Sequence, residues 1–159
     1  MFKTSLEKSL FSSPAACIKS IDARLKKLYQ KYSAEDIADI RQLEELKTAL
    51  EAITSVEFTR YQKLLELLRS TEYGWNPTDK GDRVVIFTER IETMKYLAER
   101  LRQDIGLEAD AIQEISGGMS DGEQQRIVED FGRTESPVRV LVASDVASEG
   151  LNLHYLSHR

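Results

Sequence analysis

Apolar positions in the first 70 residues recur every three or four residues, which is the period of one face of a helix. This stretch holds one proline and no glycine, so little in it would interrupt a helix. Ser13 followed by Pro14 predicts a helix start, because a hydroxyl caps free N–H groups and proline fits the first helical turn. Ser33 and Asp36 have the spacing of a capping box and predict the next start. The pattern therefore predicts an all-helical segment over residues 1–70.

The apolar pattern changes after a connector over residues 71–81, which gathers glycine, proline, asparagine and aspartate. Trp75 in this connector is expected to pack it onto a core. Residues 82–159 then alternate short apolar runs with stretches of helical period, one of which opens with a capping box from Ser120 to Glu123. Short buried strands are predicted at Val84–Phe87, Ala111–Ile115 and Val138–Ala143. Strands that alternate with helices in this way predict an α/β fold with a parallel sheet.

The composition limits the partners of the chain. The net charge is −5, so no general electrostatic attraction draws this protein to nucleic acid, and any such contact must be local. The lone cysteine excludes an internal disulfide framework, and its spacing to the two histidines predicts no metal site. No apolar run reaches membrane-spanning length, and the N-terminus lacks the pattern of a secretory signal. The expectation is a cytoplasmic protein without a membrane partner.

Small and hydroxyl residues follow each of the three predicted strands. They are Thr88-Glu89-Arg90, the stretch from Ser116 to Ser120, and Ser144-Asp145. The carboxyl ends of parallel strands meet at one edge of an open sheet, where such folds bind ligands. Free N–H groups and the helix dipole at each turn favour phosphate. Each hydroxyl alone is more simply explained as a helix cap, but three of them at one edge favour a ligand site.

Three stretches between Asp82 and Leu156 resemble the second RecA-like lobe of superfamily-two helicases. VVIFTER resembles motif IV, ISGGMSDGEQQRIVEDF resembles the glycine turn and the helix after it, and VRVLVASDVASEGLNL resembles motif V. The last is similar to that of DNA translocases of the switch/sucrose-nonfermenting type, among them the bacterial RapA-like members. The resemblance implies a partial RecA-like parallel sheet with flanking helices, preceded by the all-helical segment. It also implies an ATP-dependent helicase-like DNA translocase as the parent protein.

The same resemblance implies which residues contact nucleic acid. Thr88 and Ser144 would hydrogen-bond phosphates of the tracked strand of double-stranded DNA. Gly117 and Gly118 would offer backbone N–H groups to it, and Asp145 would hold the turn that follows the last strand, unless it is simply a helix-start carboxylate. Bonds to phosphate position a protein on a strand without reading its bases, so the implied binding is independent of sequence.

Residues further along motif V are implied to border the nucleotide. Glu149 lies there, Gly150 would let the backbone approach, and Asn152 would lie near the ribose. The chain has no G-x-x-x-x-G-K-[ST] loop and no acidic box for Mg²⁺, so ATP and Mg²⁺ are expected to need the first RecA-like lobe of the parent protein. No catalytic residue and no metal ligand is therefore expected here, and the isolated chain is expected to be inactive.

Further expectations concern the end of the chain and its alternative functions. The sequence ends at Arg159, before a motif VI, so we expect a fragment whose sheet edge is uncovered and open to self-association or to docking of its helical half. The alternative function is a non-catalytic α/β protein-interaction module whose capped turns hold no ligand. A dinucleotide-binding enzyme is excluded, because no G-x-G-x-x-G follows the first strand.

Overall fold

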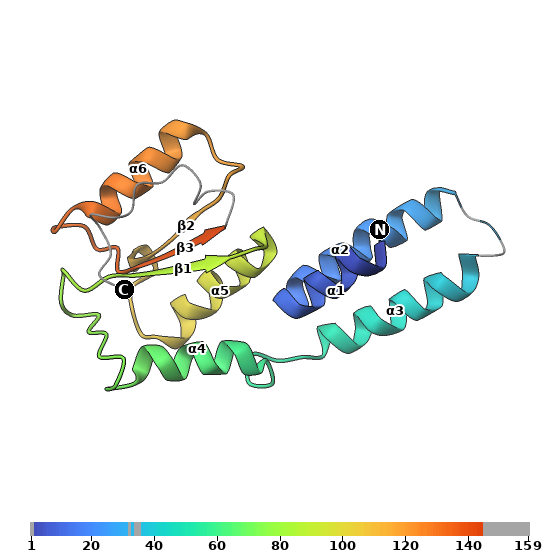
Figure 1. The fold of residues 1–159 in the computed structure, drawn as a ribbon, viewed down its shortest axis with the longest axis horizontal. Coiled ribbons are helices and arrows are strands. Elements are labelled where there is room, and N and C mark those ends of the chain that lie inside the picture. Colours follow the sequence, from blue (N-terminus) through green and yellow to red (C-terminus); the bar gives the residue numbers. More distant parts are fainter. Residues whose placement is uncertain (1, 32, 34–35, 145–159) are drawn as a thin grey trace. The chain divides into compact units, whose positions relative to one another are not determined.

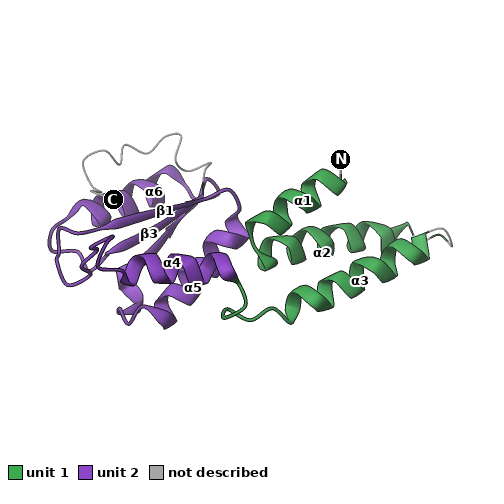
Figure 2. Cartoon of the chain, turned by 60° about the horizontal axis from the view of Figure 1, so that its bottom comes forward, with its two compact units in different colours: residues 1–58 green, residues 59–159 purple. Residues whose placement is uncertain are grey.

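The computed structural model describes residues 2–31, 33 and 36–144 of the chain. The chain divides into two compact units, Met1–Phe58 and Thr59–Arg159, which Figure 2 shows in green and purple. No helix within the described ranges is long and apolar enough to cross a membrane.

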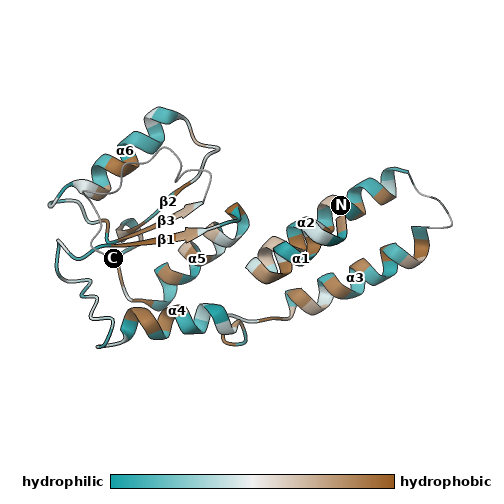
Figure 3. Ribbon diagram, in the orientation of Figure 1, coloured by the Kyte–Doolittle hydropathy of each residue, from teal (hydrophilic) through white to brown (hydrophobic). Residues whose placement is uncertain are grey.

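The first unit is built around its second helix. α2 (Pro14–Gln30) contacts both α1 (Phe2–Ser12) and α3 (Ile37–Glu51). Figure 3 shows that apolar and polar residues alternate along these helices, as the period of the sequence requires. The core residues of this unit are Cys17, Ile21, Leu25, Leu28, Ile40, Leu43 and Leu50. The structure thus confirms that this segment is built of helices, which are followed by turns over residues 52–58, and it adds α1, which the sequence did not single out.

Both helices predicted in this unit are confirmed, but only one of the two predicted caps is. Ser13 caps α2, since its Oγ accepts the N–H of Ala16 at 3.1 Å and Pro14 occupies the first turn. The capping box predicted at Ser33 is wrong. The N–H of Asp36 bonds the backbone oxygen of Ser33 at 3.1 Å, and the freed Ser33 hydroxyl donates to the Asp36 carboxylate at 2.8 Å.

As far as it is described, the second unit is a three-stranded parallel sheet with helices (Figure 1). In chain order it contains α4 (Thr59–Arg69), β1 (Val84–Thr88), α5 (Ile91–Asp104), a short 3₁₀ turn (Ala109–Ala111), β2 (Ile112–Ile115), α6 (Asp121–Gly132) and β3 (Val140–Ser144). The strand order is β1-β3-β2, and both pairings are parallel. The predicted partial RecA-like α/β fold is therefore confirmed.

The last strand is the centre of the described sheet. Every residue of β3 is buried, which confirms the sequence prediction for this run. β1 lies at an edge of the three described strands, and Phe87 on it is 51% exposed. The strand predicted at Val84–Phe87 is confirmed, but it is only partly buried, since Val85 and Ile86 are half-buried and Phe87 is exposed. A short apolar run does not reveal whether a strand lies at the centre or at the edge of a sheet.

The boundary between the units also differs from the sequence prediction. The sequence predicts a helical segment that ends at residue 70, whereas the chain divides into its two compact units after Phe58. Polar contacts explain the difference. The hydroxyl of Tyr61 in α4 donates to Asp104 of α5 at 2.6 Å, and the Arg69 guanidinium donates to the Asp104 backbone oxygen. α4 is thereby fixed to the sheet unit.

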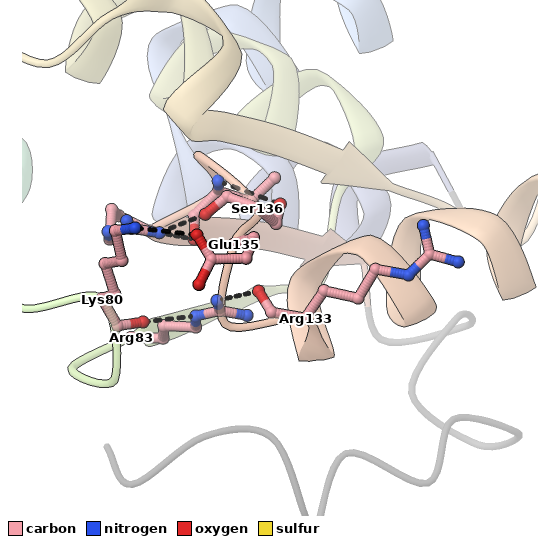
Figure 4. A network of polar contacts seen from close by, with 7 residues as sticks. Lys80, Arg83, Arg133, Glu135 and Ser136 are labelled. Carbon is pink, nitrogen blue, oxygen red and sulfur yellow. Dashed lines mark hydrogen bonds and ion pairs between the residues drawn. The ribbon is translucent and has the colours of Figure 1, made fainter.

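The connector packs as expected. Trp75 is buried, and its indole N–H donates to the backbone oxygen of Asp82 at 3.1 Å. Beyond it, a polar network joins the start of β1 to the loop after α6 (Figure 4). Lys80 pairs with Glu135 at 2.9 Å, and the buried Arg83 donates to the Lys80 backbone oxygen at 3.1 Å. This end of the strands is closed by structural contacts within the unit.

Candidate nucleic-acid interface

The opposite, carboxyl-terminal ends of the strands meet at one edge. Thr88 and Ser144 are register partners at the last residues of β1 and β3. Ile115, the last residue of β2, pairs with Ala143, so Ser116 follows at the same edge. The structure therefore brings together all three turns that the sequence predicted to share an edge, as far as they are described.

The two faces of the sheet are covered by different helices, with α5 and α6 on opposite sides in Figures 1 and 2. Leu141 and Ala143 of β3 cluster with Phe131 of α6. Successive side chains of a strand point to opposite faces, so Ser144 and its register partner Thr88 lie on the α5 face. Thr88 precedes the N-terminus of α5, which begins at Ile91, and Ser144 ends the neighbouring strand on the same face.

The hydroxyl of Thr88 already has a partner. Thr88 is buried, and its Oγ1 donates to the backbone oxygen of Arg90 at 3.0 Å. In this arrangement the Thr88 hydroxyl stabilises the turn into α5, and its only proton is already donated to Arg90. Its phosphate contact stays a prediction, one that requires the hydroxyl to turn away from Arg90.

The hydroxyl of Ser144, unlike that of Thr88, has no partner among the described residues. The residue is 1% exposed, and its Oγ has no hydrogen-bond partner in the structure as described. Buried polar groups nearly always have partners, so an orphaned hydroxyl needs an explanation such as an absent ligand. Ser144 can donate one hydrogen bond to an oxygen atom that arrives at this edge.

The glycine turn between β2 and α6 is stabilised by hydrogen bonds within the second unit. The N–H of Met119 donates to the Ser116 oxygen at 3.1 Å, which closes the turn. The side-chain amide of Gln124 donates to the same Ser116 oxygen at 3.2 Å and to the Met119 oxygen at 3.1 Å. Gly117 and Gly118 between them are exposed. The carbonyl groups are thus occupied, and the predicted contacts from the glycine N–H groups stay predictions.

The predicted capping box at the start of α6 is confirmed. The Ser120 Oγ accepts the Glu123 N–H at 3.4 Å, and the Glu123 carboxylate accepts the Ser120 N–H at 2.9 Å. The Ser120 hydroxyl and then its backbone N–H hold the pKa of Glu123 below its ordinary value. The hydroxyl of Ser120 is therefore a helix cap here, as the simpler explanation required.

Sequence reasoning missed two residues at this edge. Gln124 is one, because a glutamine on a helix looks like any other surface residue. Arg90 is the other. It stands immediately before α5 without capping it, and its Nε is buried and lacks a partner among the residues that the structure describes. An arginine within the turn predicted at Thr88 was the signal that could have found it.

The remaining predicted site residues, Asp145, Glu149, Gly150 and Asn152, lie outside the described residues, so their roles stay predictions. The groups that are described at this edge are hydroxyl, backbone N–H and guanidinium donors, which suit phosphate oxygens. Within the described ranges, no group of three or more His, Cys, Asp or Glu side chains could hold a metal ion.

Comparisons with known proteins concern mainly the second unit. Residues 59–158 match the family model of the helicase conserved C-terminal domain. The ATP-dependent RNA helicase RhlB of Pseudomonas syringae pv. tomato is 32% identical over 99 residues, which cover 62% of this chain and 21% of that protein. RhlB of Pseudomonas aeruginosa is 35% identical over 86 residues, covering 54% and 20%. The chain thus spans about a fifth of the length of these curated relatives.

A human relative and a solved structure are more distant. The probable ATP-dependent RNA helicase DDX43 of Homo sapiens is 30% identical over 77 residues, which cover 48% of this chain and 11% of that protein. The structure described as the Sulfolobus solfataricus SWI2/SNF2 ATPase core in complex with dsDNA has a TM-score of 0.44 and 18% identity, covering 82% of this chain and 28% of that one.

Proposed function

Because the chain belongs to the family of helicase conserved C-terminal domains, we propose that its second unit is the second motor lobe of an ATP-dependent helicase-like protein. In this role the carboxyl edge of the sheet holds phosphate groups of a nucleic-acid strand. The single observation that carries the proposal is the hydroxyl of Ser144, which is buried at this edge and has no partner in the structure as described.

The chemistry of the edge suits a polynucleotide backbone. Ser144 donates to a phosphate oxygen, and the N–H groups of Gly117 and Gly118 donate from the turn after β2. The N-termini of α5 and α6 add the positive ends of their dipoles. With a net charge of −5 and few such contacts, binding is weak, sensitive to salt and independent of base sequence.

In this proposal, ATP is bound by the parent protein and not by this chain alone. The chain has no phosphate-binding loop of the G-x-x-x-x-G-K-[ST] type, so a first lobe must supply it. Glu149, Gly150 and Asn152 would border the nucleotide from this side. Bound ATP with Mg²⁺ would supply the free energy for movement along the strand, while Ser144 and the glycine turn keep hold of the phosphates.

The type of nucleic acid divides the proposal in two. Duplex DNA is the first candidate, because the stretch VRVLVASDVASEGLNL resembles motif V of DNA translocases. RNA is the second, because the curated relatives reported above are RNA helicases. Phosphate contacts do not distinguish the two, since only contacts to the 2′-hydroxyl or to helix shape do so.

Binding of labelled duplexes tests the proposal. DNA and RNA duplexes of identical sequence, and a DNA duplex of unrelated sequence, are titrated with the 159-residue chain at increasing salt. We expect both DNA duplexes to bind equally, with an affinity that falls steeply with salt. A preference for the RNA duplex selects the second candidate. If no duplex binds at low salt, the proposed function is wrong.

A pair of serine variants locates the binding edge. Ser144→Ala removes the buried hydroxyl, whereas Ser5→Ala removes an exposed one from α1 of the first unit. We expect only Ser144→Ala to weaken binding. Equal affinities for both variants would show that nucleic acid binds elsewhere on the chain.

A further inference from the structure

The carboxyl edge of the sheet contains a second side chain suited to phosphate. We propose that Arg90 binds the same phosphate group as Ser144, with its guanidinium beside the N-terminus of α5. The inference rests on the proposed function for the identity of the ligand, because a phosphate group here is one of a polynucleotide. Arg90 itself is not among the contacts implied by the helicase motifs.

The position of Arg90 follows from contacts and register. Thr88 and Ser144 are register partners on neighbouring parallel strands, and both side chains lie on the face that α5 covers. The hydroxyl of Thr88 donates to the backbone oxygen of Arg90 at 3.0 Å. Thr88 is thus bonded to Arg90 and paired in register with Ser144, so all three residues belong to one corner of the sheet.

Arg90 and Ser144 share an unusual property. The Nε of Arg90 and the Oγ of Ser144 are both buried without a hydrogen-bond partner among the described residues. A buried donor without a partner destabilises a folded protein, so such atoms are rare unless a ligand satisfies them. Two of them at one corner point to one ligand.

The chemistry of the corner identifies the class of ligand. Nε of arginine donates and cannot accept, and the Ser144 hydroxyl can donate as well. Arg90 also stands at the helix N-terminus, where the dipole of α5 favours negative charge. Neither Glu89 nor Glu92 forms an ion pair with Arg90 among the described residues. An oxyanion with several acceptor atoms, such as a phosphate, matches these donors.

The unpartnered atoms allow a specific test. Removing one of them should weaken ligand binding but leave the stability of the fold unchanged or raise it. Arg90→Met keeps the length of the side chain and removes the unpaired donor. We expect its dissociation constant for duplex to rise about tenfold. The number of counterions released on binding, which sets the salt dependence, should fall by about one. Its thermal midpoint should stay unchanged or rise by about 2–4 °C, because an unsatisfied buried group is gone.

A matched variant separates this effect from loss of charge. Lys95→Met removes one positive charge from an exposed position on the same helix and should bind duplex like the unchanged protein. Inorganic phosphate provides a readout that does not depend on nucleic acid. It should raise the thermal midpoint of the unchanged protein and of Lys95→Met, and raise that of Arg90→Met less.

The outcomes distinguish this inference from the proposed function. If the unchanged protein binds duplex and Arg90→Met binds equally well with the same salt dependence, the inference is wrong and the proposed function stands. If Arg90→Met unfolds at a lower temperature than the unchanged protein, Arg90 is structural and the inference is wrong. If no duplex binds but phosphate stabilises the unchanged protein more than Arg90→Met, the anion site is supported and the proposed function fails.

Discussion

The hydroxyl of Tyr61 in α4 donates a 2.6 Å hydrogen bond to the carboxylate of Asp104, the last residue of α5. The other end of α4 reaches the same residue, since Arg69 donates to the backbone oxygen of Asp104. The rings of Tyr61 and Tyr96 also pack in a T-shaped arrangement, with 5.9 Å between centroids. One residue at the end of α5 thus anchors both ends of α4, which makes this helix part of the sheet unit.

Removing the Tyr61 hydroxyl should weaken the second unit. Tyr61→Phe keeps the ring but leaves the Asp104 carboxylate without this partner, so we expect a loss of about 1–2 kcal/mol in the free energy of unfolding. Urea denaturation followed by Trp75 fluorescence measures it, because this tryptophan is unique and lies in the second unit. Tyr29→Phe is the control, since its bond to Glu44 is exposed. Equal midpoints for Tyr61→Phe and the unchanged protein would contradict the anchoring role.

The same tyrosine should make the second unit sensitive to alkali. Burial first, and then the hydrogen bond to Asp104, raise the pKa of Tyr61 well above its ordinary value of 10.0. Folding therefore favours the protonated hydroxyl, whose contribution is complete below that ordinary value and falls as the pH rises above it. We expect the stability difference between the unchanged protein and Tyr61→Phe to shrink above about pH 10. A constant difference in urea midpoints up to strongly alkaline pH would contradict this.

The capping box of α6 should respond to acid instead. The Ser120 hydroxyl and N–H hold the pKa of Glu123 below its ordinary value of 4.5. A lowered pKa means that the carboxylate stabilises the fold above that value and loses this effect as the pH falls below it. Ser120→Ala should cost about 1 kcal/mol at neutral pH and less in acid. The check is the urea midpoint of both proteins between neutral and acidic pH, and a pH-independent cost would contradict the capping role of Glu123.

Local signals explain what the sequence predicted well. The run at Val138–Ala143 and the spacing of Ser120 and Glu123 specify a strand and a helix cap without help from distant residues, and both are confirmed. The shared edge at Thr88 and Ser144 followed from topology, since parallel strands end on the same side.

Contacts between distant residues explain what the sequence did not predict. The helical period shows which side of α4 is apolar, but not which unit that side packs against. The contact that settles this is the hydrogen bond from Tyr61 to Asp104, which joins residues 43 positions apart. Arg90 and Gln124 were missed for a related reason. A long polar side chain on or beside a helix has no periodic signature, and only its neighbours in space show whether it is solvated, satisfied or orphaned.

The isolated chain should not hydrolyse ATP. It contains no phosphate-binding loop, so nothing in it cradles the β- and γ-phosphates. We expect the release of inorganic phosphate from ATP to equal the buffer blank, with and without duplex. A contaminating ATPase would separate from the protein on a further size-exclusion step. Turnover that follows the protein peak through that step would contradict this prediction and the assignment of ATP binding to a two-lobed parent protein.

The turn after β2 should depend on one glutamine. The amide of Gln124 donates to the backbone oxygens of Ser116 and Met119 at 3.2 and 3.1 Å, so it fixes both sides of the Gly117-Gly118 turn. Gln124→Leu removes both bonds in a half-buried position, and we expect the second unit to lose about 1–2 kcal/mol of stability. Duplex affinity should fall severalfold as well, because the glycine N–H groups are no longer held in place.

The neighbouring residue provides the control for that variant. Gln125 is exposed, and its amide donates to the Glu129 side chain at 2.9 Å on the same helix. Gln125→Leu should therefore leave both stability and duplex affinity nearly unchanged. Affinity is measured well below the unfolding temperature of each variant, so that a loss of folded protein does not imitate a loss of binding. If Gln124→Leu is destabilised and still binds duplex like Gln125→Leu, the glutamine supports the fold alone and the glycine turn does not contact nucleic acid.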